Sequence, residues 1–337
     1  MASEAVVKAI SQKESCLVWA VCGAGKTEVL FHGIDTALQK GERVCIATPR
    51  TDVVLELSPR LKQAFPTIQV ASLYGGSPDR GKLSSLTIAT THQLLRYFHA
   101  FDTLILDEAD AFPYSVDQTL QYAVEQARKP VSSIIYLTAT PNESWKKEVR
   151  KGERKAVTIS ARYHQKPLPL PSFSWCGNWQ RKVKRQALPT VVLRWVDSHL
   201  MYHRPVFLFV PHIAQIEPIV SCLKKRNPHI EGVHAEDPQR KEKVAAFRKG
   251  EIPLLVTTTI LERGVTVPNL QVGVLGAEDK IFTESALVQI AGRAGRNAQF
   301  PDGDVIYFHY GKTEAMVAAR NHIQKMNKEA KRRGWIL

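Results

Sequence analysis

Residues 20–27 read Ala-Val-Cys-Gly-Ala-Gly-Lys-Thr and combine a small-residue loop with a lysine and a hydroxyl, which suits phosphate binding. An apolar run at 16–19 precedes them and predicts a buried strand, and residues 28–31 are typical of a first helical turn. Strand, glycine-containing loop and helix in this order predict a P-loop, although Ala20 stands where the strict pattern has glycine. The alternative is an ordinary turn before a helix.

The side chains and backbone of this loop predict a site for ATP with Mg²⁺. Gly23, Ala24 and Gly25 allow backbone N–H groups to close around phosphate oxygens, and the helix N-terminus adds the positive end of its dipole. Lys26 would reach the β- and γ-phosphates. Thr27 would offer its hydroxyl to Mg²⁺.

Two acids that follow a second apolar run predict the chemistry of hydrolysis. Residues 101–106 predict a strand, and Asp107 and Glu108 come at its end within the sequence Asp-Glu-Ala-Asp. Asp107 would hold Mg²⁺, and Glu108 would orient and deprotonate the attacking water. The alternative is a helix N-terminus that carries acids favoured by the dipole.

A third candidate group lies near the C-terminus, at residues 289–296, Gln-Ile-Ala-Gly-Arg-Ala-Gly-Arg. We expect a helix there, so Arg293 and Arg296, three residues apart, would face one side. Two guanidinium groups that contact the γ-phosphate would accelerate hydrolysis by about 10³–10⁵. The alternative is a basic helix with glycines that serve packing.

Expected strands and helices, which would hold these residues in place, alternate along the whole chain. Buried strands are expected at 44–47, 68–73, 86–90, 101–106, 133–137, 205–210, 230–234, 253–257, 272–276 and 304–308, with helices between them. Such alternation predicts α/β architecture with parallel sheets, which bind ligands beyond the ends of their strands. We expect two tandem parallel-sheet domains with a nucleotide cleft between them: 1–160 as domain 1, 161–187 as a linker and 188–337 as domain 2.

Composition favours a polyanionic partner. The 337 residues suit two domains, and the formal net charge of +14 suits nucleic acid or an acidic membrane face, with a generally basic surface as the alternative. No apolar run approaches the about 20 residues that span a bilayer, and no signal peptide is recognised, so we expect a cytoplasmic location. The five cysteines form no C-x-x-C pair, so no zinc site is expected.

The expected linker has a composition of its own. Residues 166–171 alternate proline with lysine and leucine, and Trp175 and Trp179 follow among several lysines and arginines. These aromatic and basic residues would contact nucleic acid. The alternative, equally compatible with the sequence, is that the tryptophans pack against a domain and the cations are solvated.

Taken together, the motifs resemble those of superfamily 2 helicases, whose fold is a pair of RecA-like domains. The segments that carry this resemblance are 20–27, 48–50, 90–93, 107–110, 138–140, 257–268 and 289–296. Further segments are similar to the ComFA-type late-competence ATPases of Gram-positive transformable bacteria; they are 19–28, 107–113, 177–179, 257–266 and 282–289.

The resemblance implies ATP-driven movement along single-stranded DNA, which would pull transforming DNA into the cell. It implies a cytoplasmic protein at the inner face of the membrane, beside the uptake channel, with other competence proteins as partners and self-assembly into oligomers. Lys26, Thr27, Asp107 and Glu108 would bind and hydrolyse ATP, and Arg293 and Arg296 would be arginine fingers. The resemblance also implies further site residues: Gly264 and Gln289 at the nucleotide, and Arg50, Thr90, Thr91 and Thr258 at the nucleic-acid backbone.

The chain departs from this family pattern in two ways. The four-cysteine zinc module and the upstream glutamine motif of the family are missing, so we expect a fragment that begins at the motor core. Two other functions stay open at this point. One is another superfamily 2 helicase, for replication restart or branch migration, and the other is a nucleic-acid-binding module with weak ATPase activity.

Overall fold

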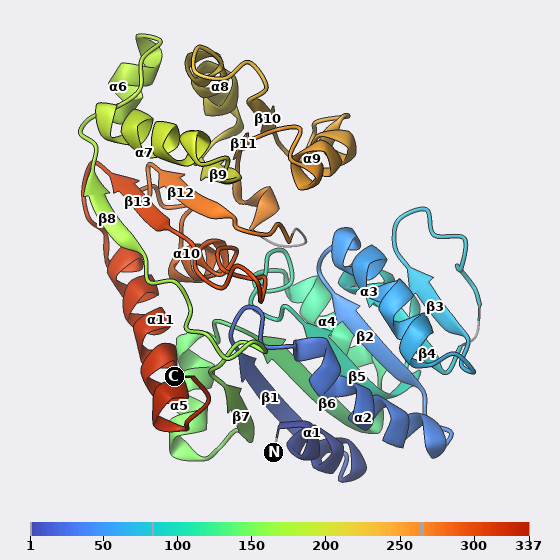
Figure 1. The fold of residues 1–337 in the computed structure, drawn as a ribbon. Helices are drawn as coiled ribbons and strands as arrows, with labels where there is room; N and C mark the ends of the chain where they lie inside the picture. The colour runs from blue at the N-terminus through green and yellow to red at the C-terminus, as the bar shows by residue number, and fades with distance from the viewer. Residues whose placement is uncertain (1, 83, 263–265, 337) are drawn as a thin grey trace. The chain divides into compact units, whose positions relative to one another are not determined.

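The computed structural model describes residues 2–82, 84–262 and 266–336. The chain forms two compact units, Met1–Ser160 and Ala161–Leu337 (Figure 1). In each unit, helices cover a sheet whose paired strands are parallel. The expected fold class of two tandem parallel-sheet α/β domains is therefore confirmed.

The sheet of the first unit has the strand order β3-β4-β2-β5-β6-β1-β7. Its strands are β1 Ser15–Ala20, β2 Val44–Thr48, β3 Val70–Leu73, β4 Leu86–Thr90, β5 Phe101–Asp107, β6 Arg128–Thr138 and β7 Ala156–Ile159. The inner strands are buried on both faces, which explains their nearly continuous apolar sequences.

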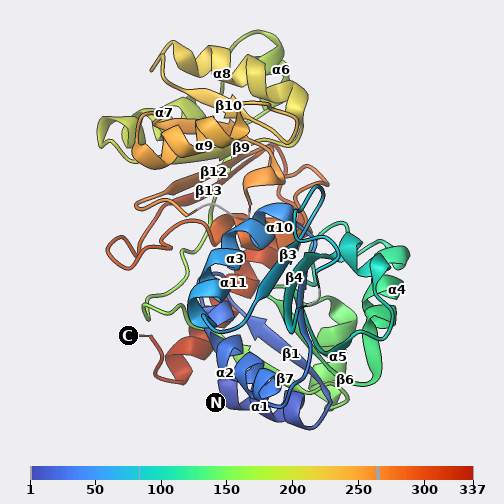
Figure 2. The same cartoon turned by 90° about the vertical axis from the view of Figure 1, so that its right-hand side faces the viewer.

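Helices cover both faces of this sheet. They are α1 Ala2–Ser11, α2 Lys26–Gln39, α3 Thr51–Ala64, the 3₁₀ helix η1 Thr91–Arg96, α4 Gln118–Ala127 and α5 Glu143–Lys151. Figures 1 and 2 show α1, α2 and α3 on one face and α4 on the other. On the α4 face, Leu104 and Leu106 of β5 join a buried cluster with Leu120 and Val124 of α4.

The sheet of the second unit has the strand order β10-β11-β9-β12-β13-β8. Its strands are β8 Ser172–Trp175, β9 Val206–Phe209, β10 Glu231–Val233, β11 Leu254–Thr257, β12 Gln271–Leu275 and β13 Val305–His309. Its helices are α6 Trp179–Lys184, α7 Thr190–Met201, η2 Ile213–Gln215, α8 Ile216–Lys224, α9 Arg240–Lys249, η3 Thr259–Leu261, α10 Glu284–Ala291 and α11 Glu314–Arg332.

The two faces of this second sheet have separate cores. Val206 and Leu208 of β9 lie in a buried cluster with residues of α6, α7 and α8. The alternate residue Phe207 stacks on Phe247 of α9 with ring centroids 4.8 Å apart. Gly273 of β12 allows Trp195 of α7 to pack closely, since a β-carbon at that position would lie 2.8 Å from the indole.

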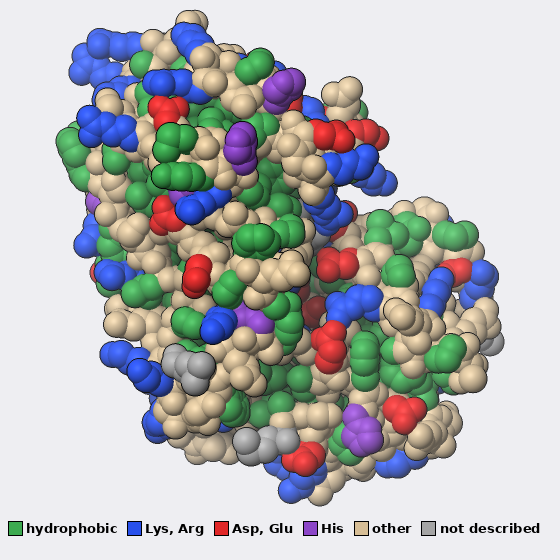
Figure 3. Space-filling view, viewed as in Figure 1, with side chains coloured by type: hydrophobic (Ala, Val, Ile, Leu, Met, Phe, Trp, Pro, Cys, Tyr) green, Lys and Arg blue, Asp and Glu red, His purple; other side chains and the backbone are tan. Residues whose placement is uncertain are grey.

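Residues 161–187, expected to be a linker, contribute elements to the second unit. Strand β8 pairs with β13 at the edge of the sheet, and α6 follows it. The two tryptophans differ: Trp179 is 2% exposed and donates from Nε1 to Glu278 Oε1 (2.9 Å), whereas Trp175 is 67% exposed. Lys and Arg side chains gather over α6 in Figure 3, and the exposed ones include Arg181, Lys182 and Lys184.

Among the described residues, no helix is both long and apolar enough to cross a membrane. All five cysteines are buried. In the same described ranges, no three His, Cys, Asp or Glu side chains are grouped so that they could hold a metal ion.

Candidate functional site

The predicted phosphate-binding loop lies between β1 and α2. Gly23 and Gly25 have φ angles of 80° and 73°, a left-handed conformation that glycine adopts without steric cost. Helix α2 begins at Lys26 with Gly25 as its N-cap, so no side chain caps its first turn. Because the first N–H groups of a helix have no partner within it, this end suits a phosphate. Lys26 and Thr27 are half-buried in that first turn.

The register of the strands brings the loop and the acids to one edge of the sheet. Strand β6 lies between β1 and β5, with Trp19 opposite Thr138 and Asp107 opposite Leu137. Neighbouring strands are about 4.8 Å apart, so β1 and β5 end about 10 Å from each other. This spacing is compatible with one nucleotide and its metal contacted from both strands.

Asp107 ends β5, and the chain turns sharply after it. Glu108 has a φ of 58°, and its N–H donates to Asp107 Oδ1 (2.9 Å). The N–H of Ala109 donates to the carbonyl of Leu137 on β6 (3.1 Å), which fastens the turn to the neighbouring strand. The two acids are therefore held by backbone contacts of β5 and β6.

Asp110 fastens the same turn to the end of β6 through two hydroxyl groups. Thr138 Oγ1 donates to Asp110 Oδ1 (2.6 Å) and Thr140 Oγ1 donates to Asp110 Oδ2 (2.7 Å). Thr138 Oγ1 also accepts from the N–H of Thr140 (3.0 Å). Both threonines are buried, at 0% and 6% exposed. The Thr-Ala-Thr segment thus positions the Asp-Glu-Ala-Asp turn.

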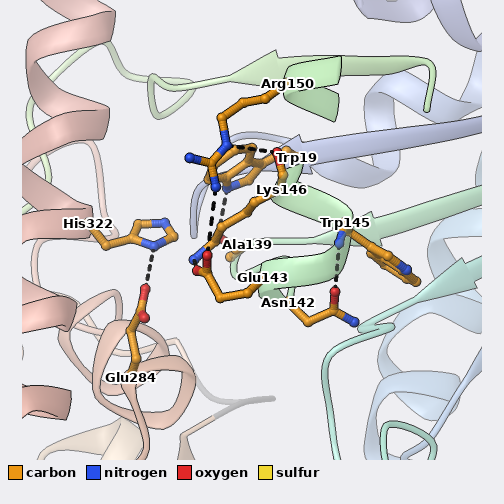
Figure 4. Close-up of polar contacts among 9 residues, drawn as sticks. All are labelled: Trp19, Ala139, Asn142, Glu143, Trp145, Lys146, Arg150, Glu284 and His322. Carbon is orange, nitrogen blue, oxygen red and sulfur yellow. Dashed lines mark hydrogen bonds and ion pairs between the residues drawn. The ribbon is translucent and has the colours of Figure 1, made fainter. Parts of the chain in front are cut away.

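The residue between these threonines also binds the strand before the phosphate loop (Figure 4). Trp19 of β1 donates from Nε1 to the carbonyl of Ala139 (3.0 Å). Shortly after, Asn142 caps α5 and accepts from the N–H of Trp145 (2.8 Å). The segment at the end of β6 therefore contacts two parts of the site. One is the strand that leads into the phosphate loop, and the other is the Asp-Glu-Ala-Asp turn at 107–110, which we call the acidic turn.

The nucleic-acid candidates of the first unit lie at the same sheet edge but on other strands. Arg50 is the half-buried N-cap residue of α3, just after β2. Thr90 ends β4 opposite Thr48 of β2, and Thr91 begins η1. Thr90 is 5% exposed and Thr91 is 0% exposed, so their side chains are buried.

The expected helix through residues 289–296 is wrong. Helix α10 ends at Ala291, and Gly292 is its C-cap. Arg293 lies in the turn that follows, at 5% exposed, and Arg296 lies at the end of that turn, half-buried. Gly295 has a φ of 61°, which ends helical geometry. The two arginines therefore do not share a helix face.

Two residues that the sequence analysis did not single out hold this turn, which we call the arginine turn (292–296). Arg162 is 2% exposed, and its Nη2 donates to the carbonyls of Ala294 (2.8 Å) and Gly292 (3.5 Å). Its Nη1 donates to the carbonyl of Gly295. His164 donates from Nε2 to the same Gly295 carbonyl (3.1 Å). No motif marks Arg162 or His164, because both lie in the stretch that reads as a linker.

Arg296 contacts a second segment of the family pattern, 257–268. Its Nη1 donates to Thr266 Oγ1 (3.2 Å). Thr258 follows β11 and is 9% exposed, and Gln289 lies on α10 at 4% exposed. Gly264, which the sequence analysis assigned to the nucleotide site, lies outside the described residues.

Other contacts hold helix α10, which leads into the arginine turn. Tyr307 of β13 donates its hydroxyl to the carbonyl of Leu287 (2.9 Å). His322 Nδ1 lies 3.0 Å from Glu284 Oε1 and ties α11 to the start of α10 (Figure 4). These contacts hold the start and the middle of α10, the helix that leads into the arginine turn.

Comparisons with known proteins agree with this geometry. Residues 2–149 match the DEAD/DEAH box helicase family, and residues 184–298 match the helicase conserved C-terminal domain. Competence protein ComFA of Bacillus subtilis (strain 168) is 59% identical over 98% of this chain and 71% of its own length. Competence protein ComFA of Streptococcus pneumoniae (strain R6) is 39% identical over 97% of this chain and 76% of its own.

A solved structure shows the same fold at low sequence identity. Dbp5 of S. cerevisiae, bound to RNA and ADP BeF3, matches with a TM-score of 0.67 and 18% identity over 93% of this chain and 83% of that chain. Together with the helicase domains and the ComFA relatives, this fold accounts for both units and for the order of the motifs. The chain belongs to the ComFA family of competence proteins and is an ATP-hydrolysing superfamily 2 helicase.

Proposed function

We propose that this protein uses ATP hydrolysis to move along single-stranded DNA and thereby draws transforming DNA into the cell. The observation that carries the proposal is that the phosphate loop and the acidic turn end at one sheet edge in a member of the ComFA family. The net charge of +14 supports a polyanionic partner.

In this proposal the first unit binds ATP. The backbone of the phosphate loop, with Gly23, Ala24 and Gly25, cradles the phosphates, and Lys26 binds the β- and γ-phosphate oxygens. Thr27 and Asp107 would hold Mg²⁺, which neutralises charge on those oxygens when it is bound. Two protein ligands are enough for this ion, because Mg²⁺ takes most of its ligands from water and nucleotide.

The acid and the arginines carry the hydrolytic step in this proposal. Glu108 orients the attacking water and accepts its proton. Arg293 and Arg296 stabilise the charge that develops on the γ-phosphate, with Gln289 and Gly264 on the same side of the nucleotide. Hydrolysis would release these contacts and change the affinity of the protein for DNA.

We further propose that Arg50, Thr90, Thr91 and Thr258 contact the DNA backbone. Arg50 supplies a cation at a helix N-terminus. The three threonines are buried, so their contribution would come from the peptide groups at the strand ends. The protein would work at the inner face of the membrane with other competence proteins, as an oligomer.

A movement assay tests the proposal. Oligonucleotides of increasing length carry a fluorophore at one end, and arrival of the protein at that end is recorded after ATP is added. Directed movement predicts a lag that grows linearly with length, and Lys26→Ala should show no arrival signal. The proposal fails if the chain hydrolyses ATP but shows no length-dependent lag, whichever end of the oligonucleotide carries the fluorophore. The chain would then hydrolyse ATP without moving along DNA.

A further inference from the structure

Arg162 is a buried cation that faces backbone carbonyls. Its side chain is 2% exposed, and it donates to the carbonyls of Gly292, Ala294 and Gly295. Desolvating a guanidinium costs free energy unless its donors are satisfied by well-placed acceptors. Three carbonyls of one short turn serve as such acceptors for Arg162.

The geometry of these contacts depends on the planar fork of arginine. The contacted carbonyls belong to Gly292, the C-cap of α10, and to Ala294 and Gly295 beyond it, close to the negative end of the helix dipole. The guanidinium reaches them with two nitrogen atoms at once, which an ammonium group on a flexible stem does not reproduce. A lysine at this position would keep the charge but lose the fork.

His164, as a neutral imidazole, makes a further hydrogen bond to the arginine turn. Its Nε2 donates to the carbonyl of Gly295, and its Nδ1 accepts from the N–H of Lys166 (3.3 Å). Burial, together with the charge of Arg162, lowers the pKa of His164. A neutral imidazole with this tautomer satisfies both nitrogen atoms.

The contacted carbonyls flank both candidate arginine fingers. Arg293 lies between Gly292 and Ala294, and Arg296 directly follows Gly295. Gly295 is required here, because a β-carbon would lie 2.1 Å from the carbonyl oxygen of Pro301. The backbone of the turn is thus confined by packing on one side and by Arg162 on the other.

The chain before Arg162 is itself bound to the phosphate loop. Ile159 ends β7 opposite Ala20, and its carbonyl accepts from the N–H of Val21 (3.0 Å). Arg162 follows three residues later. The segment that precedes Arg162 in the chain is therefore held by the residue that follows β1.

We propose that Arg162 is a positioning residue that holds the arginine turn so that Arg293 and Arg296 can act on the γ-phosphate. This inference rests on the proposed function of those two arginines. Arg162 itself acts through the turn and contacts neither nucleotide nor DNA in this proposal.

The test is the kinetics of Arg162→Lys in the full chain. Loss of the fork should lower kcat for ATP about 10- to 100-fold, as expected for a small displacement of catalytic groups. The KM for ATP and the Kd of a fluorescent ATP analogue should stay within about twofold. The matched control is Arg154→Lys, because Arg154 lies shortly before Arg162 in the chain but binds Glu148 (2.7 Å) and the ring of Trp145. This variant should keep wild-type kcat.

A double-mutant cycle with Arg296→Ala separates the possible results. If Arg162 acts through the turn, Arg162→Lys should lower kcat little further in the Arg296→Ala background. Two losses that simply multiply, or a wild-type kcat for Arg162→Lys, would overturn the inference and leave the proposed function intact. A wild-type kcat for Arg296→Ala would overturn both. If Arg162→Lys does not fold, His164→Ala replaces it in the same cycle, with the same expected and opposing results.

Discussion

Removing the hydroxyl of Thr138 should weaken the acidic turn more than removing that of Thr140. Thr138→Val loses a charge-assisted hydrogen bond to Asp110, worth about 1.5–3 kcal/mol, and leaves the buried N–H of Thr140 without its acceptor, which adds about 1–3 kcal/mol. Allowing for some relaxation, we expect a total of about 3–5 kcal/mol. Thr140→Val loses the bond from Thr140 Oγ1 to Asp110, for which we expect about 1.5–3 kcal/mol.

Hydrogen exchange of peptides from β5 and β6 measures this effect locally, without assuming two-state unfolding of a two-unit chain. A cost of 3 kcal/mol corresponds to about 100-fold faster exchange, since about 1.4 kcal/mol is a factor of ten. Thr138→Val should also lower kcat, because Asp107 and Glu108 belong to the turn that Asp110 fastens.

Thr103→Val is the matched control for this prediction. Thr103 and Ser133 share a buried hydroxyl pair between β5 and β6 (2.8 Å), away from the strand ends. Breaking this neutral pair should speed exchange but leave kcat unchanged. The role given to Thr138 is wrong if Thr138→Val speeds hydrogen exchange no more than Thr140→Val does. It is also wrong if Thr103→Val lowers kcat as much as Thr138→Val.

Four further predictions concern phosphate binding, pH and salt. Lys26→Ala should abolish ATP turnover, and residual turnover in the purified variant would contradict its role. The lowered pKa of His164 means that stability is lost as the pH falls below about 6.5, because the unfolded chain then binds the proton more readily. His164→Gln should therefore flatten the fall in Tm. A hydrogen bond from His199 lowers the pKa of Asp304, so the Asp304 carboxylate stabilises the fold above about pH 4, and this stabilisation is lost below. The difference in Tm between the wild type and Asp304→Asn should therefore vanish in acid. Binding of single-stranded DNA should weaken steeply with salt, and a salt-independent Kd would exclude phosphate contacts.

The first unit shows how far local sequence signals reach. An apolar run, a glycine-containing loop and a helix start are all contiguous, so the end of β1, the loop and α2 are predictable from residues 16–31. The acids after β5 are predictable for the same reason. Their common sheet edge follows from parallel strands, although the order β5-β6-β1 that sets their spacing requires the structure.

The second unit shows where such signals end. Residues 289–296 have helical composition at their start, but Gly292 and the left-handed Gly295 end the helix before the arginines. Strand β8 has only four residues among prolines and is an edge strand, so its pairing with β13 has no sequence signature. Arg162 could not be recognised either, because its partners are carbonyls about 130 residues away in the chain.

ATP turnover measured with single-stranded DNA, duplex DNA or single-stranded RNA shows which nucleic acid is coupled to hydrolysis. A single-stranded DNA translocase should be stimulated strongly by single-stranded DNA and little by the other two, with no turnover in Lys26→Ala under any of these conditions. Equal or greater stimulation by RNA or duplex DNA would contradict a single-stranded DNA translocase. Turnover that is independent of nucleic acid would contradict the coupling of hydrolysis to DNA altogether.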